Sequence, residues 1–174
     1  MTKIATKTIQ YAIYDRTSGS AKFVEDTTSY TRPELAMMTD GITGSGIMGE
    51  IDLPALAQLD SMEFELVLNN TNERAIAMFA PGAHTMESRW VTNVLNTATG
   101  SSEIQANKEI IKYLPKSLDM GDVENNETNE ATLTGEVLTY QYIINGKTVI
   151  KIDKLNNVFV VNGKDYAAAI RNAI

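Results

Sequence analysis

Alternating apolar and polar residues mark several short segments of this chain. Residues 61–68 read SMEFELVL, so Glu63 and Glu65 fall between inward-facing apolar side chains. Because successive side chains of a strand point to opposite faces, this pattern predicts a half-buried strand. Residues 7–15, 86–96 and 104–114 are also predicted strands, and residues 22–30 form a weaker one. The pattern indicates a mostly β protein.

Two Asn-Gly pairs, Asn145-Gly146 and Asn162-Gly163, lie between β-branched and aromatic residues in the last third of the chain. A type I′ turn needs positive φ at both central residues, and Asn-Gly meets this need best. We therefore predict two hairpins, which join residues 137–144 to 147–153 and residues 158–161 to 164–166.

Two short helices are predicted as well. The first covers residues 72–79 and stops at Pro81-Gly82, and the second ends the chain with Asp165 as its N-cap. A helix this short is unstable alone in water, so one face of each must pack against the rest of the protein. The expected packing residues are Ala75, Ile76 and Phe79 in the first helix, and Tyr166, Ile170 and Ile174 in the second.

Two segments lack the packing residues of a strand or helix. Residues 38–54 are rich in glycine and contain isolated large apolar side chains, which order more readily against a partner than within one subunit. The alternative is a mobile surface loop. Residues 115–131 are polar and acidic, so we expect a surface linker there. The candidate interface residues of the first segment are Met38, Ile42, Ile47, Met48 and Ile51.

These elements predict a single domain over residues 1–174. Its length is enough to bury roughly 70% of the unfolded surface. Many strands with two short helices indicate an all-β fold with minor α content. We expect a two-sheet sandwich or barrel with short flanking helices.

Composition narrows the classes of function. Fifteen basic and 22 acidic residues give a net charge of −7, and the basic residues are scattered, which argues against binding to a nucleic-acid backbone. The chain has no cysteine, which suits synthesis in a reducing cytoplasm. No stretch approaches the length of a membrane span, and residues 1–7 lack the apolar run of a secretory signal, so we expect no membrane association.

Candidate catalytic residues are few. His84 is the single histidine, and it follows Pro81-Gly82 in what is expected to be a solvated loop. Glu63 and Glu65 share a strand face, but alternating outward glutamates are usually a polar surface rather than a carboxylate pair. Trp90 is expected in the core. We therefore expect no enzyme, no metal and no cofactor.

The C-terminal third resembles the tail tube proteins of contractile-tailed phages and phage-tail-like bacteriocins. The matching motifs are Ile144-Asn145-Gly146-Lys147, Lys151-Ile152-Asp153, Val161-Asn162-Gly163 with Asp165, and Ile170-Arg171. Asn145 stands where the family often has Asp, which preserves the turn. Upstream, Tyr113–Gly121, Thr31-Arg32-Pro33-Glu34-Leu35, the glycine-rich segment and the strand at Ser61 also resemble the family.

This resemblance implies a structural protomer of the inner tube of a contractile injection machine. Six subunits would form a ring whose inner strands fuse into a continuous barrel around a lumen, and rings would stack into a hollow tube within the sheath. The implied partners are further copies of the chain, the tail sheath protein, and the baseplate and tail terminator proteins. DNA would pass through without specific binding, along a lumen to which Glu63 and Glu65 contribute.

The same resemblance implies synthesis in the bacterial cytoplasm and release, on lysis, in a virion or a headless bacteriocin particle. Two other functions stay open. One is a secreted hexameric ring of a type VI secretion system, which would share the architecture. The other is a monomeric β-sandwich binding module, which an exposed cluster of aromatic residues would favour.

Overall fold

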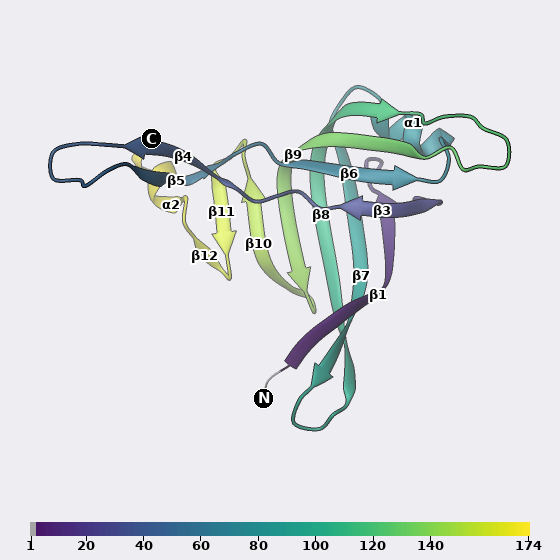
Figure 1. Ribbon diagram of the computed structural model, residues 1–174, viewed down its shortest axis with the longest axis horizontal. Coiled ribbons are helices and arrows are strands. Elements are labelled where there is room, and N and C mark those ends of the chain that lie inside the picture. Colours follow the sequence, from purple (N-terminus) through teal and green to yellow (C-terminus); the bar gives the residue numbers. More distant parts are fainter. Residues whose placement is uncertain (1–2) are drawn as a thin grey trace.

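The computed structural model describes residues 3–174 (Figure 1). Its strands are β1 (Lys3–Asp15), β2 (Lys22–Phe23), β3 (Thr27–Thr31), β4 (Met37–Ile42), β5 (Ile51–Leu59), β6 (Glu63–Leu68), β7 (His84–Asn96), β8 (Ser102–Asp119), β9 (Ala131–Ile144), β10 (Lys147–Asp153), β11 (Val158–Val161) and β12 (Lys164–Asp165). The helices are α1 (Glu73–Phe79) and α2 (Ala168–Ala173). The prediction of a mostly β fold with short helices is confirmed.

One large antiparallel sheet organises the molecule. Its strands lie in the order β12-β11-β10-β9-β8-β7-β1-β2, and β4 and β5 form a separate two-stranded sheet. The first half of β9 also pairs with β6, which in turn pairs with β3. Strands β3 and β6 therefore cross over the long strands as a second layer, as Figure 1 shows. Both layers belong to one sheet, because β9 continues from one into the other.

The core lies between these two layers. Phe64 and Leu66 of β6 are 1% and 0% exposed, while Glu63 and Glu65 face water, as the alternation predicted. Phe64 and Leu66 pack with core side chains from β1, α1, β7, β8, β9 and β10. These include Ile13, Ala75, Met86, Ile111, Val137 and Ile152.

Both Asn-Gly hairpins are confirmed. Asn145 and Gly146 have φ of 47° and 82°, and Asn162 and Gly163 have φ of 50° and 84°. The turns join β9 to β10 and β11 to β12, so all four residues adopt the backbone that a type I′ turn requires.

The helices differ in detail from the prediction. Asn72 caps α1 by accepting a hydrogen bond from Ala75 N, but Met78 is buried while Ile76 and Phe79 are exposed. The N-cap of α2 is Ala167, and the expected cap was wrong: Asp165 instead accepts from Ala167 N and pairs with Arg171. α2 has no buried residue, and Ile174, which follows it, is 94% exposed and does not pack as expected.

Three segment boundaries also differ. The weak strand at residues 22–30 is divided into β2 and β3, and residues 38–54 lie in a hairpin rather than an irregular loop. β8 continues to Asp119, so the irregular part of the acidic connector is limited to residues 120–130. Leu118 pairs with Leu133 and packs on the core, which explains why the strand continues past Pro115. Pro115 itself lies beside a register shift, where a missing donor is tolerated.

Candidate assembly surfaces and buried charge clusters

The hairpin of β4 and β5, residues 37–59, projects from the body (Figure 1), and we call it the arm. Ile42 pairs with Ile51, and Asp40 pairs with Leu53. Since alternate residues share a face, Met38 lies on the same side as these apolar residues. Met38, Ile42, Ile51 and Leu53 are 43–51% exposed. One side of the arm is therefore an exposed apolar stripe.

The tip of the arm extends this apolar surface. Met48 is fully exposed, whereas Ile47 is half-buried in the turn. Four of the five candidate interface residues are thus exposed in the isolated subunit. Their contact with another subunit stays a prediction. Exposed apolar patches of this kind usually mark interaction surfaces.

The opposite side of the arm faces the C-terminal strands. A groove of about 330 Å³ separates Met37, Pro54 and Leu56 of the arm from Phe159, Val161 and Tyr166. β4 and β5 pair only with each other among the described strands. The arm is therefore connected to the body mainly through its two ends.

The large sheet has an unpaired edge at each end. On its outer side β1 pairs with β2 at Tyr14 and Asp15, and Ile13 O accepts from Val24 N, so no described strand covers Lys3–Ala12 on that side. At the other end, β12 pairs only with Val160 and Val161. Unpaired edges leave backbone N–H and C=O groups free to pair with another chain.

Glu63 and Glu65 lie on the water-facing side of β6. Lys116 of β8 pairs with Glu63 at 2.5 Å, and both side chains are about half exposed. An exposed pair of this kind contributes little to stability. The structure thus confirms that both glutamates face water, and their position in a lumen stays a prediction.

The uncovered face of the large sheet is a second water-facing surface. Strand register places Arg89 beside Lys108, and Lys112 lies four residues further along β8 on the same face. Lys151 lies on the same face, opposite Gln141. These side chains are exposed or half-buried, so this face is basic although the whole chain is acidic.

Glu87 is a buried carboxylate on this basic face. Its side chain is fully covered and pairs with Arg16 at 2.5 Å and with Arg89. Burial raises the pKa of Glu87, but hydrogen bonds from the two arginines outweigh this effect and keep the pKa below its usual value. The cluster is a compact ion network, and sequence reasoning missed it.

A second buried carboxylate, Glu109, holds the residue that leads into the arm. Arg32 Nε donates to Glu109 Oε2 at 2.7 Å, and Arg32 Nη2 donates to Tyr140 Oη at 2.7 Å. Tyr140 Oη and Tyr30 Oη also donate to the Glu109 carboxylate. Glu109 is 1% exposed. Burial and the neighbouring carboxylate raise the pKa of both tyrosines.

The guanidinium of Arg32 also lies over two aromatic rings. Its Cζ is 4.7 Å from the Trp90 ring centre and 4.6 Å from the Tyr142 ring centre, and the two rings are stacked with an interplanar angle of 6°. Trp90 is half-buried, so the expectation that it is a core residue was wrong. Its ring, with that of Tyr142, forms the surface on which the Arg32 guanidinium lies.

A third carboxylate, Glu136, binds the chain where it leaves the arm. Ser61 Oγ donates to Glu136 Oε2 at 2.6 Å, and Met62 N donates to Oε1 at 3.2 Å. Lys154 pairs with Glu136 at 2.9 Å. Burial raises the pKa of Glu136, but hydrogen bonds from these three donors lower it by more. The pKa of Glu136 therefore lies below its usual value.

His84 is a packing residue, and the expectation of a solvated loop was wrong. It is 7% exposed, its ring stacks on Tyr113, and its Nε2 is 2.7 Å from Ala80 O. His84 is the first residue of β7 and pairs with Tyr113 of β8, so its side chain lies on the inward face of the sheet. The described residues contain no cluster of three or more metal-ligating side chains. No helix among residues 3–174 is long and apolar enough to cross a bilayer.

One signal in the sequence could have revealed Glu109. It shares the inward face of β8 with Ile111 and Tyr113, so alternation places a charged residue on an apolar face. Arg32 lies in the Thr31–Leu35 segment that resembles the family, but nothing in the sequence pairs it with Glu109. Their separation of 77 residues explains why.

Comparison with known proteins supports a structural role. Among solved structures, the chain has a TM-score of 0.49 and 12% identity to the sheath/tube terminator, in its extended state, of an extracellular contractile injection system. That match covers 78% of this chain and 93% of the other, and it is too weak for any argument. No curated protein matches. The family described as phage tail tube protein FII matches residues 17–174, so this chain belongs to the phage tail tube family and has a structural role in a tail tube.

Proposed function

We propose that this protein is the protomer of the inner tube of a contractile tail, in which hexameric rings stack into a hollow conduit. Family membership supports the tube role. The observation that carries the assembly is the arm, whose exposed apolar stripe has no partner within the described subunit. A folded subunit with such a projection is incomplete until another subunit covers it.

Ring closure is supported by the two free edges of the large sheet. The uncovered side of β1 in one subunit would pair with β11 and β12 of the next. Closing the ring in this way pairs both edges of the large sheet and removes a template for aggregation. Ile4 and Ile9 on β1 are 49% and 57% exposed, and such pairing would cover them.

The arm would then make the contacts between subunits and between rings. Met38, Ile42, Ile47, Met48 and Ile51 are the proposed interface residues. The tail sheath protein would surround the tube, and the baseplate and tail terminator proteins would contact its two ends. The subunit would be made in the bacterial cytoplasm and released on lysis within a virion or a bacteriocin particle.

Two alternatives use the same fold. A secreted ring of a type VI secretion system would share the hexameric architecture. A monomeric binding module would need an exposed aromatic platform, but the rings of Trp90 and Tyr142 stack on each other and the guanidinium of Arg32 lies over both. The geometry therefore supports the tube over the binding module.

Size-exclusion chromatography followed by negative-stain imaging tests the proposal. We expect purified protein at high concentration to form rings of six-fold symmetry and tubes. Rings that never stack would contradict the stacked tube. A protein that stays monomeric at high concentration and after co-expression with its neighbouring tail proteins would refute assembly altogether.

The charge of the lumen is a separate prediction. We propose that Glu63 and Glu65 line the channel and let a polyanion slide past without binding. Replacing both with lysine should leave tubes intact but make them retain DNA at low salt, because each phosphate contact adds a salt-dependent increment to affinity. DNA co-sedimentation with assembled tubes, measured at low and high salt, gives the result.

The uncovered basic face provides the control for this experiment. Replacing Lys108 and Lys112 with glutamate changes the charge of the other water-facing surface by the same amount. If Glu63 and Glu65 line the lumen, this second variant should not alter DNA retention. The opposite outcome is that wild-type tubes retain DNA and only the Lys108→Glu/Lys112→Glu tubes lose it. That outcome would indicate that the basic face lines the lumen instead.

A further inference from the structure

Two legs connect the arm to the body, residues 32–36 before β4 and residues 60–62 after β5. They meet at one backbone hydrogen bond, from Asp60 N to Ala36 O at 3.0 Å. Because β4 and β5 pair with no other described strand, the sheet itself does not set the direction of the arm. The contacts of the two legs set it, together with the base of β5, where Leu59 packs against the core.

The first leg is fixed at Arg32. Glu109 Oε2 and Tyr140 Oη accept its hydrogen bonds, and its guanidinium lies over the stacked rings of Trp90 and Tyr142. Hydrogen bonds fix the position of the guanidinium, and stacking fixes its tilt. Lysine could supply the charge but neither the planar fork nor the stacking. Pro33, the next residue, is buried and has a fixed φ, so little freedom remains at the start of this leg.

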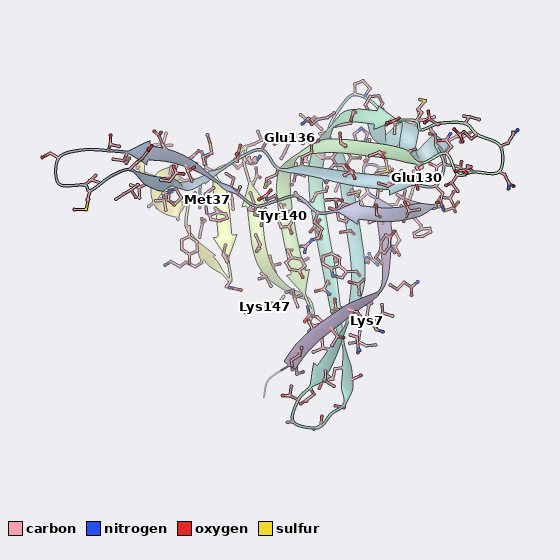
Figure 2. The ribbon with its side chains drawn as sticks, viewed as in Figure 1. Lys7, Met37, Glu130, Glu136, Tyr140 and Lys147 are labelled. Atoms are coloured by element: carbon pink, nitrogen blue, oxygen red, sulfur yellow. The ribbon has the colours of Figure 1, made fainter. Side chains whose placement is uncertain are left out.

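The second leg is fixed at Ser61 and Met62. Glu136 accepts from the side chain of Ser61 and from the backbone of Met62, and Lys154 holds Glu136 in place. The Met62 side chain is fully buried. Figure 2 shows Glu136 and Tyr140 on the body near the two legs, with Met37 further out at the start of the arm.

We propose that Glu109 and Glu136 act as a pair of clamps that hold the arm at one angle, with Arg32 as the positioning residue of the first leg. A hairpin held at one point can rotate about it, whereas a hairpin held at two cannot. Each carboxylate is on a long strand of the sheet, β8 or β9, which gives the clamps a rigid base. The consequence for assembly rests on the proposed function, since only a fixed arm meets its neighbour in the same way in every ring.

The experiment measures the arm angle directly in the monomeric subunit. The chain has no cysteine, so two introduced cysteines carry spin labels without background. One label replaces Asp52 on the arm and the other replaces Lys112 on β8, both of which are exposed. A second pair, at Lys112 and Lys164, reports on the body alone. Double electron–electron resonance then gives the distance distribution of each pair.

Three variants release the clamps. Arg32→Lys and Glu109→Gln act on the first leg, and Glu136→Gln acts on the second. We expect a single narrow arm-to-body distance in the wild type and loss of that narrow peak in each variant. The body pair should stay unchanged. Arg32 is 42% exposed at its side chain, so its variant tests the proposal even if Glu109→Gln fails to fold.

Glu87→Gln is the matched control. Glu87 is also a buried carboxylate paired with arginine, but it lies on the other face of the sheet and touches neither leg. It should lower the melting temperature without broadening the arm distance. An equal broadening in Glu87→Gln, or a narrow peak in Arg32→Lys and Glu136→Gln, would overturn the clamp.

Assembly is measured separately on the same variants without labels. We expect clamp variants to form fewer and shorter tubes than wild type at equal concentration, and Glu87→Gln to form them normally. A wild type that does not assemble would refute the proposed function and leave the distance result valid. Normal tubes from clamp variants with broadened arms would overturn the inferred role of the arm angle.

Discussion

Replacing Ile42 and Ile51 with threonine is expected to abolish tube formation without unfolding the subunit. The two side chains face each other on the apolar stripe of the arm and are 43% and 46% exposed. Covering a whole Ile side chain contributes roughly 1.5–3 kcal/mol, and about half of each is still exposed here. The pair therefore contributes roughly 1.5–3 kcal/mol to each contact, or about 10- to 100-fold in its association constant.

Threonine keeps the hairpin intact, because it is β-branched and pairs well across strands. The control is Thr39→Ser with Asp52→Asn, two polar changes on the opposite side of the same arm. Sedimentation and negative-stain imaging should show tubes for the control and none for Ile42→Thr/Ile51→Thr. Equal melting temperatures would show that only assembly changed. Normal tubes from the threonine variant would contradict the proposal that the arm forms part of the subunit interface.

Substitution of Gly135 is expected to produce the largest loss of stability. A Cβ there would lie 2.8 Å from Phe64 Cε1, 2.8 Å from Tyr113 Cδ2 and 2.9 Å from Leu114 O. Both rings are buried and contact each other edge-on, and the carbonyl belongs to a paired strand, so none can yield easily. Given room, alanine in a strand would gain about 0.5–1 kcal/mol over glycine. The clash reverses the sign.

We expect Gly135→Ala to lower the free energy of unfolding by about 1–3 kcal/mol, the usual cost of overpacking, and Gly135→Val to lower it further. Gly44→Ala is the control, since Gly44 has open space and no positive φ. Urea unfolding gives the values. Phe64→Leu combined with Gly135→Ala should cost less than the sum of the two single changes, because leucine gives way to the new methyl group. Strict additivity would show that the clash is not with Phe64.

Local pattern predicted much of the fold because local physics decides those elements. Phe64 and Leu66 alternate with Glu63 and Glu65, and this sets the inward face of β6 whatever lies opposite. The Asn-Gly turns need a backbone that few other residue pairs adopt, so both hairpins were correctly placed. The acidic connector was partly correct, but pairing with β9 extended β8 to Asp119.

Two of the errors come from packing against distant segments. His84 and Trp90 were assigned to the wrong environments because their neighbours, Tyr113, Tyr142 and Arg32, come from elsewhere in the chain. Residues 38–54 were expected to be irregular, since no apolar core could form there. They form a hairpin because backbone pairing between β4 and β5 does not require one.

The sequence by itself determined that this is a mostly β protein with two type I′ hairpins, an exposed apolar segment and the motifs of a tail tube family. These follow from alternation, turn chemistry and composition, each of which acts over a few residues. Only the tertiary structure decided that β9 joins the two layers, that Gly135 is enclosed by two rings, and that Glu109 and Glu136 meet the legs of the arm. These depend on contacts between residues tens of positions apart, whose pairing no local rule specifies.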